Sequence, residues 1–119
     1  MAKAYWINST AKTVTEVEYN SVEDMRNFIG GFLTLAYRHD NEDVLYVDDL
    51  GLYKDVPYFF YFYRPDQALA GNGLLVGKEV EVEDHPNGYI TLDPAMSIEQ
   101  FRELVMFIID IDELANIPE

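Results

Sequence analysis

Hydrophobic and polar residues alternate in several short stretches of the chain, and this alternation predicts β-strands. The first two stretches, residues 3–8 and 13–19, flank a polar turn and predict an antiparallel hairpin with one solvated face. Residues 32–37 are largely apolar on both faces, so we expect that strand to lie at the centre of a sheet. Further strands are expected at residues 44–47, 74–76, 78–83 and 89–92, the last two joined by a turn over residues 84–88.

Two stretches show helical spacing instead. Ser21 is expected to cap a helix whose apolar stripe ends at Gly30-Gly31; the stripe contains Val22, Met25, Phe28 and Ile29. Ser97 to Gln100 reads as a capping box before a second helix. Its expected buried stripe consists of Ile98, Phe101, Leu104, Val105, Ile108 and Ile109.

These elements predict one α+β domain over residues 1–109. We expect a mainly antiparallel sheet of about five to seven strands with both helices packed on one face. Residues 110–119 form an acidic C-terminal tail with the apolar spacing of a continuing amphipathic helix.

Six consecutive aromatic residues, 58–63, follow Pro57. If they form a strand, we expect Phe60 and Phe62 to enter the core and the tyrosine-rich set to lie on a surface. Tyrosine is favoured at protein contacts, so a partner or dimer interface is predicted at Tyr58, Tyr61 and Tyr63. Burial of both faces and stacking of bases on the rings are the alternatives. We expect residues 64–73 to form a loop. The alternative hypothesis for this region is that residues 57–73 form a ligand pocket.

The charge of the chain narrows its partners. Twenty-two acidic residues against eight basic ones give a net charge of -14. Such a surface repels nucleic acids and anionic membranes and attracts basic protein surfaces. The alternative is that the acidity serves solubility or adaptation to a high-salt cytoplasm.

Some of the acidic residues are regularly spaced along the chain. Alternate residues of a strand share one face at about 6.6–6.8 Å, so Glu79, Glu81 and Glu83 are expected to form a row of carboxylates. Glu16 and Glu18 would add a second row if the two strands were neighbours. Five more acidic residues gather at two predicted turns: Asp40, Glu42, Asp43, Asp48 and Asp49. Rows of this kind can imitate the phosphates of DNA, although they also occur as ordinary solvated strand faces.

No catalytic or metal-binding signature is present in the sequence. There is no cysteine, which excludes disulfides, thiolate catalysis and cysteine-ligated metals. The two histidines, His39 and His85, adjoin aspartates in predicted turns without the spacing of a metal site. We therefore expect a non-enzyme without metal or cofactor; a hydrolase using either histidine is a third reading.

Several short motifs occur in a characteristic order between Tyr5 and Phe101. They are Thr13 to Val17, Ile29 to Phe32, Leu45 to Asp48, Gly51-Leu52, Pro57 followed by Ala68, Gly71 to Gly77, and Asn87-Gly88 to Leu92. In this order the chain resembles a family of small phage, plasmid and bacterial proteins classified only as domain-of-unknown-function family 3846. The resemblance implies a compact α+β domain and no known activity. The aromatic run departs from the family pattern, where a more polar segment is expected.

Charge and resemblance together predict a small acidic accessory protein of phage or mobile-element type, in the cytoplasm. We expect it to bind and modulate a protein with a basic, nucleic-acid-binding surface, as a DNA mimic or anti-defence inhibitor. A homodimer is possible, whereas direct contact with nucleic acid or membrane is not expected. The alternative hypothesis is that the chain is a ligand-binding or regulatory module.

Overall fold

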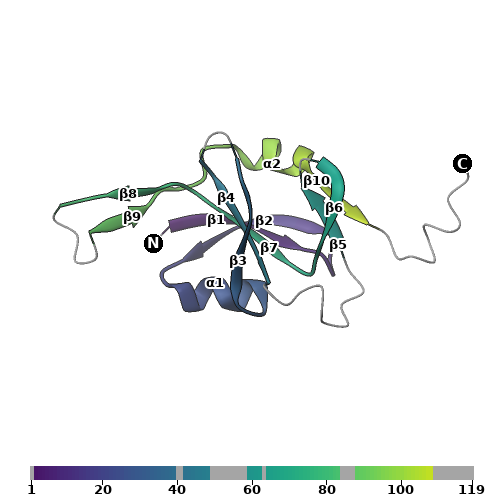
Figure 1. Ribbon diagram of the computed structural model, residues 1–119, viewed down its shortest axis with the longest axis horizontal. Helices are drawn as coiled ribbons and strands as arrows, with labels where there is room; N and C mark the ends of the chain where they lie inside the picture. Colours follow the sequence, from purple (N-terminus) through teal and green to yellow (C-terminus); the bar gives the residue numbers. More distant parts are fainter. Residues whose placement is uncertain (1, 40–41, 49–58, 63, 84–87, 109–119) are drawn as a thin grey trace, which may run out of the picture.

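The computed structural model describes residues 2–39, 42–48, 59–62, 64–83 and 88–108. These residues form an α+β fold of antiparallel strand pairs and two helices (Figure 1). The elements in chain order are β1 (Ala2–Asn8), β2 (Thr13–Tyr19), α1 (Val22–Ile29), β3 (Leu33–Arg38), β4 (Val44–Asp48), β5 (Phe59–Phe62), β6 (Arg64–Ala70), β7 (Gly73–Val76), β8 (Glu79–Glu81), β9 (Tyr89–Thr91), α2 (Ile98–Leu104) and β10 (Val105–Ile108).

The described strands form three sheets rather than the one sheet that was expected. The main sheet has the order β2-β1-β7-β4-β3, a second sheet has the order β10-β5-β6, and β8 pairs with β9 alone. The hairpin of β1 and β2 confirms the alternation read from the sequence, with Ala2 opposite Tyr19 and Asn8 opposite Thr13. Strand β1 also pairs with β7 along its other edge, and its residues face both apolar clusters, so neither of its faces is the solvated one.

The first helix follows its sequence signals closely. Ser21 Oγ accepts a hydrogen bond from the Asp24 amide at 3.1 Å, and Gly30 closes the helix in the left-handed conformation with φ 84°. Met25 and Ile29 are buried as expected. Val22 is 54% exposed, so it does not belong to the buried stripe in which it was expected.

The two helices pack against opposite faces of the main sheet, so the expected placement on one face is wrong. Neighbouring residues of β1, β4 and β7 point alternately to two apolar clusters. One cluster contains Met25 and Ile29 of α1, and the other contains Phe101 of α2. In Figure 1, α1 lies below the crossing strands and α2 above them.

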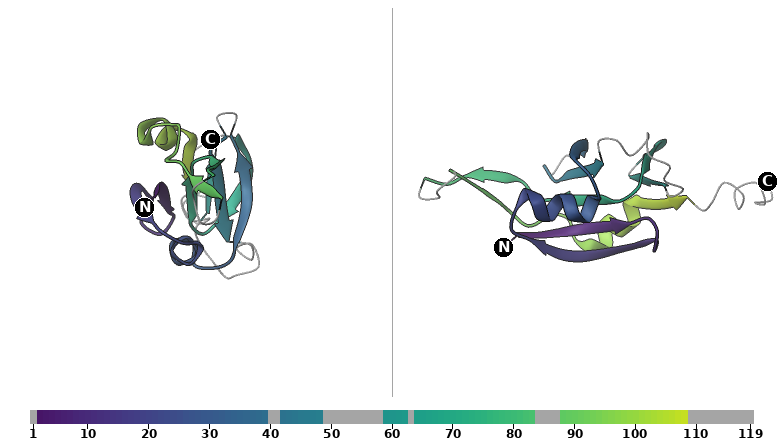
Figure 2. Two further views of the ribbon diagram at one scale, coloured as in Figure 1. Left: turned by 90° about the vertical axis from the view of Figure 1, so that its left-hand side faces the viewer. Right: turned by 90° about the horizontal axis from the view of Figure 1, so that it is seen from below.

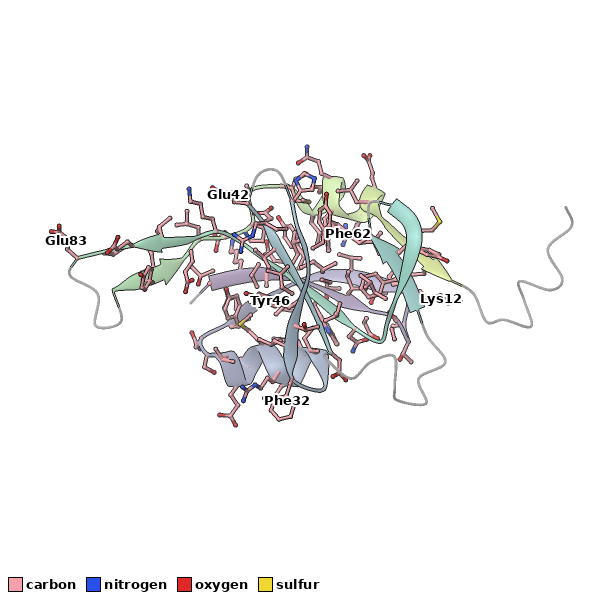
Figure 3. All side chains as sticks on the ribbon, in the orientation of Figure 1. Lys12, Phe32, Glu42, Tyr46, Phe62 and Glu83 are labelled. Atoms are coloured by element: carbon pink, nitrogen blue, oxygen red, sulfur yellow. The ribbon has the colours of Figure 1, made fainter. Side chains whose placement is uncertain are left out.

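Strand β3 is an edge strand of the main sheet, which corrects its expected central position. The short strand β7 lies at the centre instead, where all four of its residues are buried. On β3, Leu35 is 46% exposed, and the preceding Phe32 is 63% exposed with the guanidinium of Arg26 at 5.1 Å from its ring centroid. Phe32 points away from the body of the protein below α1 (Figure 3).

Two corrections concern the second sheet. Residues 64–70 form β6 rather than a loop, and residues 105–108 form β10 rather than the end of a helix. Both strands pair with β5, which lies between them. The helix therefore ends at Leu104, because the apolar residues after it gain backbone partners on the aromatic strand.

Burial of β5 agrees with the expectation for the phenylalanines. Phe60 is fully buried and Phe62 is 6% exposed, both in the cluster on the α2 face of the main sheet. Phe60 approaches Gly73 of β7 closely, and a Cβ added to Gly73 would lie 2.9 Å from Phe60 Cζ. The second sheet thus packs on the first at a point where a side chain is missing.

We predict that Gly73→Ala destabilises the protein by about 1–3 kcal/mol, because the new methyl group overlaps a rigid buried ring. Urea unfolding measures the loss. In a Phe60→Leu background the same substitution should cost less, because the smaller side chain leaves space. An equal cost in both backgrounds would place the effect of Gly73 elsewhere.

Candidate partner-binding surface

The hairpin of β8 and β9 projects from the body of the protein, as Figure 1 and the right-hand view of Figure 2 show. Its register places Glu79 opposite Thr91 and Glu81 opposite Tyr89, so these four side chains share one face. Val80 and Ile90 are paired on the other face. We refer to this hairpin, residues 79–91, as the arm.

The arm presents the predicted row of carboxylates. Glu79, Glu81 and Glu83 are all exposed. Glu83 lies beyond the end of β8, at the far end of the arm (Figure 3). The exposure of these three residues was predicted from alternation, and their role in binding stays a prediction.

The other predicted acids do not join this row. Glu16 and Glu18 are exposed on β2, which pairs with β1 and not with β8, so the two rows lie on different sheets. Asp48 is half-buried at the end of β4, close to Gly31. Asp49 lies outside the described residues. The predicted acidic residues are thus spread over different sheets. Among those that the structure describes, only the arm carries a row of exposed carboxylates.

Of the predicted interface tyrosines, only Tyr61 can be placed. It is half-buried on β5 and lies opposite Met106 of β10, which is 58% exposed. Tyr58 and Tyr63 lie outside the described residues. An interface at this face of the second sheet remains a prediction.

Asp43 has a role that the sequence did not indicate. It was grouped with the turn acids, but it is only 1% exposed. Its carboxylate accepts hydrogen bonds from the amides of Ala95 at 2.8 Å and Met96 at 3.0 Å. Tyr5 Oη donates to the Met96 carbonyl at 2.8 Å. Asp43 therefore anchors the segment between the arm and α2, and no local pattern distinguishes it from its exposed neighbours.

The histidine neighbourhoods provide no assembled site in the described residues. His39 lies in the turn between β3 and β4, where its amide donates to the Asp43 carbonyl at 2.8 Å. Its ring centroid is 6.2 Å from that of Tyr37. His85 lies outside the described residues. Across the described part of the chain, no three acidic or histidine side chains come together as a metal site would require.

A cleft opens between the start of α1 and the arm. Its volume is about 1060 Å³. The residues that line it come from both ends of the main sheet, from α1 and from the arm; they include Tyr19, Val22, Arg38, Tyr46, Lys78 and Tyr89. None of the described residues between 59 and 73 lines this cleft, and Phe60 and Phe62 lie in the core.

The rim of the cleft carries an ion pair. Lys78 Nζ lies 2.8 Å from Glu42 Oε2, and both side chains are about half exposed. The hydrogen bond from Lys78 lowers the pKa of Glu42, and the charges of Lys78 and Arg38 add to the effect. Since both partners are solvated, we assign this pair a positional role at the base of the arm.

The floor of the cleft includes a buried hydroxyl. Tyr19 is 7% exposed, and its Oη forms no hydrogen bond of ordinary geometry with the described residues. Burial raises the pKa of Tyr19, and the nearby side chain of Thr91 offsets part of this increase. Burial also raises the pKa of Tyr5, with a contribution from the negative charge of Glu16.

Comparisons with known proteins identify no relative. No family model, curated protein or solved structure matches the chain. The resemblance to family 3846 therefore stays a prediction. Neither described helix is long and apolar enough to span a membrane.

The two buried tyrosines predict opposite responses to loss of the hydroxyl. Tyr5→Phe should cost about 1 kcal/mol, because it removes the hydrogen bond to Met96. Tyr19→Phe should leave the free energy of unfolding unchanged or slightly increased, because it removes a buried hydroxyl without a partner. Urea unfolding at neutral pH compares the two, and a larger loss in Tyr19→Phe would contradict the geometry.

The same residues predict a loss of stability at alkaline pH. Above the ordinary tyrosine pKa of about 10, the unfolded chain ionises while the folded protein keeps its tyrosines protonated, so unfolding becomes more favourable. Stability should be constant with respect to these groups below that pH and fall above it. Tyr19→Phe should reduce the slope in urea titrations between about pH 9 and 11. An unchanged slope would remove Tyr19 from the explanation.

Proposed function

We propose that this chain is a small acidic, non-enzymatic binding protein whose arm engages a basic surface of a partner protein. The observation that supports this most directly is the row of exposed carboxylates, Glu79, Glu81 and Glu83, on a hairpin that projects from the body. The net charge of -14 also favours a basic partner, since a negatively charged protein attracts basic surfaces over a distance and repels nucleic acid.

The shape of the arm favours a groove as its target. A two-stranded hairpin is only about 5 Å wide between its strands, so it can enter a groove that a whole domain cannot. Basic grooves of this kind hold nucleic acid in nucleases, restriction enzymes and repressors. We therefore propose a nucleic-acid-binding protein of this class as the partner, in the setting of a phage or mobile element.

Mimicry of DNA is limited to the arm in this proposal. A duplex presents two phosphate rows, whereas Glu16 and Glu18 lie on another sheet and supply no second row beside the arm. The arm can occupy part of a phosphate track, with the remaining charge acting by long-range attraction.

The test compares two double variants that remove equal charge. Glu81→Gln/Glu83→Gln neutralises the arm, and Glu16→Gln/Glu18→Gln neutralises exposed positions on β2. The partner is captured from a bacterial extract, identified by mass spectrometry and purified, and its affinity is measured over a range of NaCl concentrations. We expect the arm variant to bind on the order of tenfold more weakly at low salt, with a shallower salt dependence.

The control variant on β2 should retain most of the affinity, and duplex DNA should compete with the wild-type chain for the partner. Equal weakening by both variants would reduce the effect to net charge and contradict a specific role of the arm. Binding that duplex DNA leaves unaffected would contradict a nucleic-acid-binding groove as the target.

A further inference from the structure

The cleft is bordered by exposed apolar side chains on both sides. Val22 of α1 is 54% exposed, and Tyr89 of the arm is 53% exposed on the same face as Glu79 and Thr91, which also line the cleft. These two belong to the few large hydrophobic side chains that the described residues leave exposed, yet they come from elements far apart in the sequence. An apolar rim of this kind is typical of a contact site rather than of a solvated surface.

The charges of the cleft differ from those of the whole chain. Among the described residues, its lining carries two basic side chains, Arg38 and Lys78, and two acidic ones, Glu42 and Glu79, and these four charges cancel. Lys78 and Glu42 are paired with each other. The described lining therefore adds nothing to the net charge of -14. An apolar side chain can enter here without displacing a row of hydrated carboxylates.

The acidic row begins at the edge of this cleft and runs away from it. Glu79 lines the cleft, Glu81 ends the same strand, and Glu83 follows beyond it at the far end of the arm. A partner segment that lies along the arm thus meets an apolar cleft first and carboxylates next. Its matching chemistry is apolar side chains at one end and lysine or arginine beyond them.

We infer that the cleft between α1 and the arm binds an amphipathic basic segment of the partner protein, with apolar side chains in the cleft and basic side chains along Glu81 and Glu83. This inference rests on the proposed function and specifies the part of the partner that is recognised. The cleft volume, about 1060 Å³, is at the upper end of the range of small-molecule pockets, and the cleft is open, which suits a segment with several side chains.

The contacts along the carboxylates and the contacts in the cleft should depend differently on salt. Contacts of the carboxylates weaken as salt increases, because counterions screen exposed charges. Burial of Val22 and Tyr89 removes apolar surface from water, and that contribution does not depend on screening. Substitution in the cleft should therefore lower affinity at every salt concentration by the same factor.

Two synthetic peptides of equal length and equal lysine content serve as probes. One carries leucine between its lysines, and the other carries serine. Fluorescence anisotropy with the full chain over a range of NaCl concentrations gives both affinities. We expect the leucine peptide to bind on the order of tenfold more tightly, with this ratio retained at high salt.

Val22→Thr/Tyr89→Thr tests the cleft directly, since it removes apolar surface at both positions, and threonine suits the strand at residue 89. We expect this variant to lose the preference for leucine while its salt dependence is unchanged. Leu35→Thr, an exposed residue of β3 that does not line the cleft, is the matched control and should keep the preference. Circular dichroism confirms that each variant is folded, and amide shifts in NMR spectra should concentrate around residues 22 and 89–91.

Several results would overturn the inference. They are equal binding of the two peptides, loss of the preference in Leu35→Thr as well, and amide shifts confined to other acidic surfaces. Self-association that Val22→Thr/Tyr89→Thr abolishes would assign the cleft to a second copy of the chain instead. If Glu81→Gln/Glu83→Gln weakens both peptides while the leucine preference is absent, the proposed function of the arm stands and the cleft fails. If the preference persists but that variant matches Glu16→Gln/Glu18→Gln, the cleft stands and the proposed function fails.

Discussion

Strand β7 joins the two halves of the main sheet, and the positions of the other elements depend on it. It pairs with β1 along one edge and with β4 along the other, and all of its side chains are buried. Gly73 leaves room for Phe60, which brings the second sheet onto the first. After β7, Gly77 lies so close to the carbonyls of Leu92 and Asp93 that any Cβ would overlap them, so both strands of the arm leave the sheet together. Strand β7 and the glycine that follows it therefore determine both the packing of the core and the direction of the arm.

A second constraint acts on the return segment of the arm. The buried carboxylate of Asp43 holds the amides of Ala95 and Met96, while Tyr5 holds the Met96 carbonyl. A buried carboxylate is costly unless it is hydrogen-bonded, and here backbone amides provide that compensation. Because Asp43 precedes β4 and Tyr5 lies on β1, the segment is fixed to both sides of β7. The base of the arm is thus rigidly positioned, which a projecting binding element requires.

Local signals in the sequence predicted local structure correctly. The caps at Ser21 and Ser97, and alternation in β1, β2 and β8, each act within a few residues. Errors arose where distant pairing decides the outcome: residues 105–108 have spacing that fits a helix or a strand, and pairing with β5 selects the strand. Exposure of Glu79, Glu81 and Glu83 followed from alternation. The cleft could not be predicted, because its lining residues, such as Val22 and Tyr89, are brought to one site only by the arrangement of the main sheet.

The distribution of apolar surface bears on why the chain is acidic. Solubility alone is served by charge spread over the surface, and exposed apolar side chains work against it. The arm combines both features, since exposed Tyr89 lies opposite exposed Glu81 and on the same face as exposed Glu79. A two-stranded hairpin is also marginally stable by itself, so it gains most from a contact that covers its apolar side chains. Acid that attracts a basic partner, placed beside apolar surface that such a partner can cover, favours a binding role for the arm over a role in solubility.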